Sequence, residues 1–180
     1  MKTKSLRWAF KTFILSIFLS IVFGIVSQSL FPNISAYFSV FIILFFIFIS
    51  VIFDMIGVSV ASLKKEKLEL LKDEIGYKTA VKMSNNIDKI SSFCGDVVGD
   101  ICGILSGAGG VSLVVNMHIQ NPNIFFLVTS LISSFIAGLT IFCKAIMKTY
   151  AVENSLNVIM KVAKTLETNP FSHLFKKNKK

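Results

Sequence analysis

The feature that most constrains this chain is a long stretch without charge. No Asp, Glu, Lys or Arg occurs between Lys11 and Asp54. A membrane-spanning helix needs about 20 predominantly apolar residues, so this stretch is long enough for two. The sequence Phe-Pro-Asn-Ile-Ser at 31–35 divides it with a proline turn. The charge-free stretch therefore predicts one spanning helix over about Trp8–Leu30 and a second over about Ala36–Leu63.

Two more apolar stretches follow a polar segment that covers residues 64–89. One runs over about Ile90–Val115. The other covers about Ile124–Cys143 and is expected to continue past Lys144, after a polar turn at 116–123. The chain is 53% hydrophobic and only 16% charged, whereas a soluble domain has about 25% charged residues. We therefore predict an all-α fold, a polytopic membrane helical bundle with four spans.

The first apolar stretch has two interpretations. Lys2, Lys4 and Arg7 precede it, as in a cleaved signal peptide. Its apolar core exceeds the roughly 7–15 residues of a signal peptide, which favours a retained signal-anchor helix. We divide the chain into this N-terminal helix and turn (1–35), a transmembrane domain (36–168) and a basic tail (169–180).

The positions of the basic residues predict the orientation of the bundle. Of the 19 Lys and Arg, four lie in residues 1–11, seven in 64–89 and eight in 144–180. The turns at 31–35 and 116–123 contain none. By the positive-inside rule, the N-terminus, the 64–89 loop and the C-terminus of this multi-pass cell-membrane protein are expected in the cytoplasm. The net charge of +9 is then expected to meet the anionic inner leaflet of the lipid bilayer, and no nucleic acid.

The 64–89 segment has the pattern of a juxtamembrane helical hairpin. Residues 64–75 carry one apolar helical face, Gly76 is typical of a helix stop, and a second short helix is expected at about Lys78–Asn85. An ordinary solvated loop is the alternative. The apolar face consists of Leu68, Leu71 and Ile75.

The C-terminal segment predicts an amphipathic helix, because its apolar residues recur at steps of four and three. Pro170 is expected to end this helix. The apolar stripe consists of Val152, Leu156, Ile159, Ala163 and Leu166.

Three acidic residues interrupt the apolar stretches. An ionised carboxylate in hydrocarbon costs about 2.5–3.5 kcal/mol on insertion scales, so such residues usually face a bundle interior or water. At 1.5 Å per residue, Asp54 lies about 13 Å from the cytoplasmic end of its helix and Asp100 about 15 Å into the next. Asp96 lies four residues before Asp100, on the same helix face. All three are therefore expected to meet in one layer.

We therefore predict a metal site in this layer. Its carboxylate ligands would be Asp54, Asp96 and Asp100, and Ser59 and Ser92 would add neutral oxygens. Hard cations prefer carboxylate and carbonyl oxygen. The alternative is a polar packing network in which the acids pair with Lys144 as an internal counter-charge.

Glycines recur every four residues along the third apolar stretch. Small residues at this spacing let helix backbones touch, within the chain or across a homodimer. The predicted helix-packing residues are Gly95, Gly99, Gly103 and Gly107. We find no nucleophile triad or phosphate-binding loop, and we therefore expect no enzymatic activity.

Three segments resemble the transmembrane domain of the cyclin M/CorC family of magnesium transport proteins. They are Phe53–Leu63, Ile90–Ile101 and Ile141–Ala151. The resemblance covers roughly residues 36–168. It implies three spans with a cytoplasmic helical hairpin between the first and second, a dimer, and a role in magnesium transport.

The chain also departs from the family pattern. The family usually has an acid where this chain has Gly57, and asparagines at Asp96 and Asp100. It usually has an acid and a proline where this chain has Lys144 and Met147. The regulatory pair of CBS domains that usually follows the family domain is expected to be absent.

We therefore expect an integral membrane protein that binds or transports a divalent cation through an intramembrane acidic site. The alternative is a non-transporting membrane partner or regulatory protein whose acids pair with Lys144.

Overall fold

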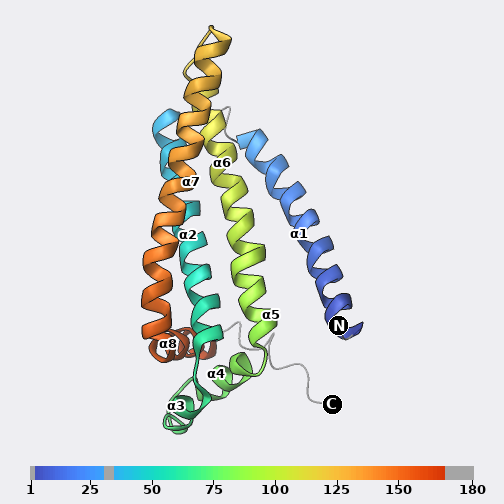
Figure 1. Ribbon diagram of the computed structural model, residues 1–180, viewed down its shortest axis with the longest axis vertical. Helices are drawn as coiled ribbons and strands as arrows, with labels where there is room; N and C mark the ends of the chain where they lie inside the picture. The colour runs from blue at the N-terminus through green and yellow to red at the C-terminus, as the bar shows by residue number, and fades with distance from the viewer. Residues whose placement is uncertain (1–2, 31–34, 169–180) are drawn as a thin grey trace.

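The computed structural model of the protein describes residues 3–30 and 35–168, and these residues form helices joined by short turns (Figure 1). This confirms the predicted all-α fold. In chain order the elements are α1 (Thr3–Leu30), α2 (Ala36–Ser62), α3 (Lys65–Glu69), α4 (Tyr77–Ser84), α5 (Ile87–Ser92), the π-helix η2 (Phe93–Val98), α6 (Gly99–Val115), α7 (Pro122–Glu153) and α8 (Ser155–Thr168).

Three helical stretches of the described chain are long and apolar enough to cross a membrane. They are α2, the continuous α5–η2–α6 rod (Ile87–Val115) and α7. The protein is therefore a membrane protein with three candidate spans. The apolar part of α1, Ala9–Ile25, is shorter, so a fourth span through α1 stays a prediction. As expected, the last apolar helix continues past Lys144.

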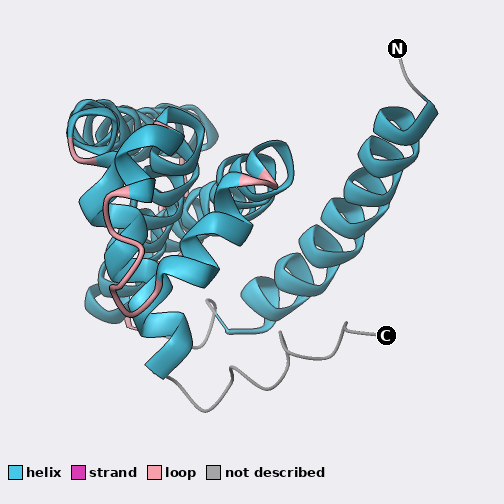
Figure 2. Ribbon diagram, turned by 90° about the horizontal axis from the view of Figure 1, so that it is seen from below, coloured by secondary structure: helices cyan, strands magenta, loops and turns pink. Residues whose placement is uncertain are grey.

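The three candidate spans lie side by side, and α1 leans away from them (Figures 1 and 2). Large apolar side chains face outward along the spans; the Phe126 side chain, for example, is 74% exposed. A water-soluble protein would bury such side chains, whereas a bilayer offers them hydrocarbon contacts. Two apolar clusters hold the bundle together. One is Ile43, Ile47, Val51 and Ile136, and the other is Val97, Ile101 and Leu105, against which Leu19 and Phe46 pack.

At one end of the bundle, α3, α4 and α8 form a separate group, which we call the terminal layer (Figure 1). Its core joins the end of α2 to all three helices. In α8, Ile159 and Ala163 are fully buried while Lys161 and Lys164 are exposed, as the sequence predicted. The two ends of the predicted stripe differ, because Val152 belongs to α7 and both Val152 and Leu166 are exposed. The buried residues of this core are Val60, Leu63, Leu68, Ala80, Met83, Ile159, Met160 and Ala163.

The segment before α4 differs from the expected helix over residues 64–75. The structure is helical only over Lys65–Glu69, and the chain then turns. Leu71 still packs against the core that contains Leu68, but Ile75 is exposed, so the predicted apolar stripe is buried only as far as Leu71. Gly76 does not end that helix but precedes α4, with a left-handed φ of 102°.

Some predicted features fall outside the described residues. They are most of the turn at 31–35, the helix stop at Pro170 and the basic tail at 169–180.

Candidate functional site

The acidic residues of the third apolar stretch lie at a break in helix geometry. Asp96 belongs to the π-helix η2, and Asp100 lies in the first turn of α6. A π segment has one more residue per hydrogen-bonded turn than an α-helix and is frequent at functional sites. Both side chains are exposed on the surface of the rod, and they interact electrostatically with each other.

Asp54 approaches this segment from α2. A Cβ atom added at Gly95 would lie 3.5 Å from Oδ1 of Asp54, whose side chain is half-buried. Because Gly95 immediately precedes Asp96, the structure brings acids from two candidate spans to the same level of the bundle.

Lys144 approaches the same segment from α7. A Cβ atom added at Gly99 would lie 3.2 Å from Nζ of Lys144. The half-buried lysine interacts electrostatically with Asp100, the next residue of α6. Among the described residues it forms no direct ion pair with a carboxylate, so this attraction acts over a longer distance.

Asp54, Asp96, Asp100 and Lys144 form a polar cluster, which we call the polar group. Ser50 also belongs to it, although the sequence alone did not identify this residue. Its side chain is 1% exposed and its hydroxyl donates a hydrogen bond to the carbonyl oxygen of Gly99 at 3.2 Å. The available signal was its position four residues before Asp54, on the same helix face. Serine is common in these apolar stretches, so position alone did not distinguish it.

The two serines that were predicted as neutral ligands have different surroundings. The fully buried Ser59 donates to the carbonyl oxygen of Ala151 at 3.3 Å and so connects α2 to α7. Ser92 is half-buried in the last turn of α5.

The predicted glycine ridge divides into two halves. Gly95 and Gly99 lie against Asp54 and Lys144, whereas Cβ atoms added at Gly103 and Gly107 would meet no atom within 4 Å. Of these four glycines, only Gly95 and Gly99, the half nearer the acids, make close contacts with other described residues.

Within the part of the chain that the structure describes, no group of three or more His, Cys, Asp and Glu side chains is placed to hold a metal ion. The carboxylates of Asp54, Asp96 and Asp100 therefore do not form one ready coordination sphere. Asp54 lies beside η2, and the other two acids lie on the outer side of the rod. The metal-ligand set stays a prediction.

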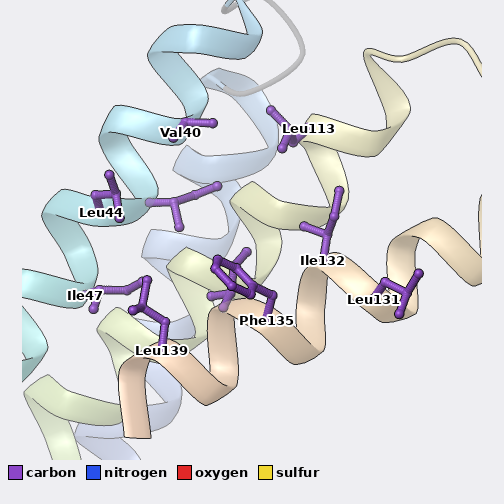
Figure 3. A pocket seen from close by; sticks show the side chains of 10 residues that line it. Val40, Leu44, Ile47, Leu113, Leu131, Ile132, Phe135 and Leu139 are labelled. Carbon is purple, nitrogen blue, oxygen red and sulfur yellow. The ribbon is translucent and has the colours of Figure 1, made fainter. Parts of the chain in front are cut away.

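An apolar cavity of about 500 Å³ lies apart from these acids, between α2, α6 and α7 (Figure 3). Val40, Leu44 and Ile47 line it from α2, opposite Ile132 and Phe135 of α7. Since all of its lining residues are apolar, it offers an ion no ligand and is not part of the candidate site.

No protein-family model, no curated protein and no solved structure matches this chain. The relationship to the cyclin M/CorC family therefore stays a hypothesis that rests on the sequence resemblance.

Proposed function

We propose that the protein binds a divalent cation, such as Mg²⁺, inside the membrane and moves it across, with Asp54, Asp96 and Asp100 as its acidic ligands. The observation that carries the proposal is the position of Asp54 beside Gly95, which puts acids from two candidate spans at one level. Ionisable residues within spans are costly and commonly mark ion pathways.

The charge of the polar group favours a cation. Three carboxylates and Lys144, if all ionised, leave two negative charges uncompensated. Removal of a charge from water is expensive unless a partner compensates it. A divalent cation would neutralise this excess, and the exposed side chains of Asp96 and Asp100 would be the first groups that it meets.

The bundle would be oriented with the terminal layer in the cytoplasm. The seven basic residues of the 64–89 segment would then face the anionic inner leaflet. A homodimer, as the family resemblance implies, would cover the outward-facing side of η2 and α6.

A second candidate function is a non-transporting membrane partner or regulatory protein. It is favoured by the electrostatic interaction between Lys144 and Asp100. In this alternative the ammonium group serves as the permanent counter-charge of the acids, and the polar group holds the bundle together instead of binding an ion.

Mg²⁺ binding and flux in proteoliposomes test the first candidate. We expect Asp100→Asn to weaken Mg²⁺ binding by about tenfold or more, because the site loses one carboxylate ligand. A tenfold change in affinity corresponds to about 1.4 kcal/mol of binding free energy. Asp73→Asn is the matched control, because Asp73 lies in the exposed turn before α4 and its loss should leave the signal unchanged.

The same preparation tests the second candidate through Lys144→Met. If Lys144 is the permanent partner of the acids, this variant lowers the unfolding temperature, because carboxylates within the spans lose the positive charge that compensates them. If a cation site is present, the variant binds Mg²⁺ more tightly, because a competing positive charge has gone. Absence of any Mg²⁺ response in both the wild type and Lys144→Met would rule out the cation site.

A further inference from the structure

The carboxylate of Glu167 joins the end of α8 to the beginning of α4. Its Oε2 accepts a hydrogen bond from the Gly76 amide at 3.0 Å. Its Oε1 accepts from the Thr79 amide at 3.2 Å and from the Thr79 hydroxyl at 2.7 Å. The first amides of a helix have no partner within that helix, so Glu167 caps α4 from a different helix, 91 residues away from Gly76.

The backbone around this contact is tightly fitted. A Cβ atom added at Gly76 would lie 2.9 Å from the amide nitrogen of Lys164, so α8 runs directly against the turn that begins α4. Ala80 and Ala163, both fully buried, lie in the core between the same two helices. The small residues on both helices let their backbones approach closely, and larger side chains at these positions would separate α8 from α4.

The other end of α8 is a bend of a single residue. Asn154, with φ −110° and ψ 26°, separates α7 from α8, and α8 turns across the end of the bundle (Figure 1). The direction of α8 is therefore not fixed by a continuous helix. It depends on the contacts that α8 makes within the terminal layer.

We propose that α8 is a hinged clasp that holds the α4 end of the hairpin against the bundle, with Asn154 as the hinge and the Glu167 carboxylate as the catch. In the closed state, which the structure shows, the Glu167 carboxylate accepts hydrogen bonds from the Gly76 and Thr79 amides at the beginning of α4. In the open state α8 swings away, these amides face water, and the apolar face of α8 separates from α4.

The clasp also reaches the polar group of the bundle. Only Asn85 and Asn86 separate α4 from α5, and α5 continues directly into η2, which carries Asp96. The closed clasp therefore limits how far this helix can move. The effect on cation binding rests on the proposed function, whereas the docking of α8 does not.

Hydrogen exchange measured by mass spectrometry on the full-length protein in lipid nanodiscs tests the clasp. We expect Glu167→Gln to increase exchange at least fivefold in residues 76–84 and 155–168, because a neutral amide is a weaker partner for the three donors than a carboxylate. The matched control is Glu153→Gln, the same chemical change at an exposed side chain of α7, which should exchange as the wild type does.

A second variant tests the catch without altering α8. Thr79→Asp places a carboxylate opposite Glu167, and repulsion should open the clasp and increase exchange in 155–168. Exchange in Glu167→Gln and Thr79→Asp equal to that of Glu153→Gln would overturn the proposal, because α8 would then be held by its apolar core alone. Increased exchange in a protein that shows no Mg²⁺ response would keep the clasp and reject only its link to the cation site.

Discussion

At positions 95 and 99, glycine makes room for charged side chains. The atoms nearest to a Cβ atom at these positions belong to Asp54 and Lys144. A side chain at position 99 would crowd the ammonium group of Lys144, whereas a Cβ atom at position 95 would make an ordinary van der Waals contact with Asp54. The four-residue spacing predicted close packing, but the identity of the neighbours required the structure.

The carboxyl of Glu167 gives the clasp a defined pH dependence. The Thr79 hydroxyl, the Gly76 and Thr79 amides and the nearby charge of Lys78 together hold the pKa of Glu167 below its ordinary value of 4.5. A lowered pKa in the folded state means that the interaction contributes fully above pH 4.5. The contribution is lost as the pH falls through the lowered folded pKa.

We therefore expect the wild type to unfold at a higher temperature than Glu167→Gln at pH 7, and the difference to disappear in acid. Thermal unfolding in detergent from pH 7 to pH 3 measures it, with Glu153→Gln as a control whose difference from the wild type stays small throughout. A difference between the wild type and Glu167→Gln that does not shrink at all between pH 7 and pH 3 would show that the carboxylate charge is not its source.

At the scale of helices, Gly57 allows α2 to pack closely against the α5–η2 segment. A Cβ atom at Gly57 would lie 3.1 Å from the carbonyl oxygen of Ser91 and 3.3 Å from the Cβ atom of Cys94. A valine at this position must push the two helices apart, and overpacking of this kind costs about 1–3 kcal/mol.

The expected result is that Gly57→Val unfolds at a lower temperature than the wild type in detergent. Gly103→Val is the matched control, because a Cβ atom there meets nothing within 4 Å while the change in helix propensity is the same. Equal destabilisation by both variants would contradict this account of the α2 contact.

The sequence predicted the long helices well and their interruptions poorly. A charge-free stretch and a proline turn are strong local signals, so α2 begins at Ala36 as expected. The π segment at Phe93–Val98 has no such local signal in the sequence. The helix predicted over residues 64–75 was too long, since α3 ends at Glu69; the spacing of apolar residues does not show where their buried surface ends.

The same limit applied to the candidate site. Asp54, Asp96 and Asp100 could be selected from the sequence because charge is rare in apolar stretches. Ser50 could not, since a serine gains its role only when a carbonyl such as that of Gly99 lies opposite. Distances between spans are tertiary information that periodicity along one helix does not contain.

For the molecule as a whole, charge separates the two ends of the bundle. The lysines of the terminal layer are exposed, and the connection between α6 and α7 at the opposite end contains no Lys or Arg. If the positive-inside rule holds here, that connection lies outside the cell. Chemical labelling tests this orientation.

Single cysteines at the two ends provide this test in intact cells. Gln120 lies in the exposed connection between α6 and α7, and Asp73 in the exposed turn before α4. We expect a membrane-impermeant maleimide to label Gln120→Cys and to leave Asp73→Cys unlabelled until the cells are lysed. The native cysteines give little background, since Cys94 and Cys102 are buried and Cys143 is half-buried. Labelling of Asp73→Cys alone in intact cells would reverse the orientation, and the acids nearest the terminal layer would then be approached from outside.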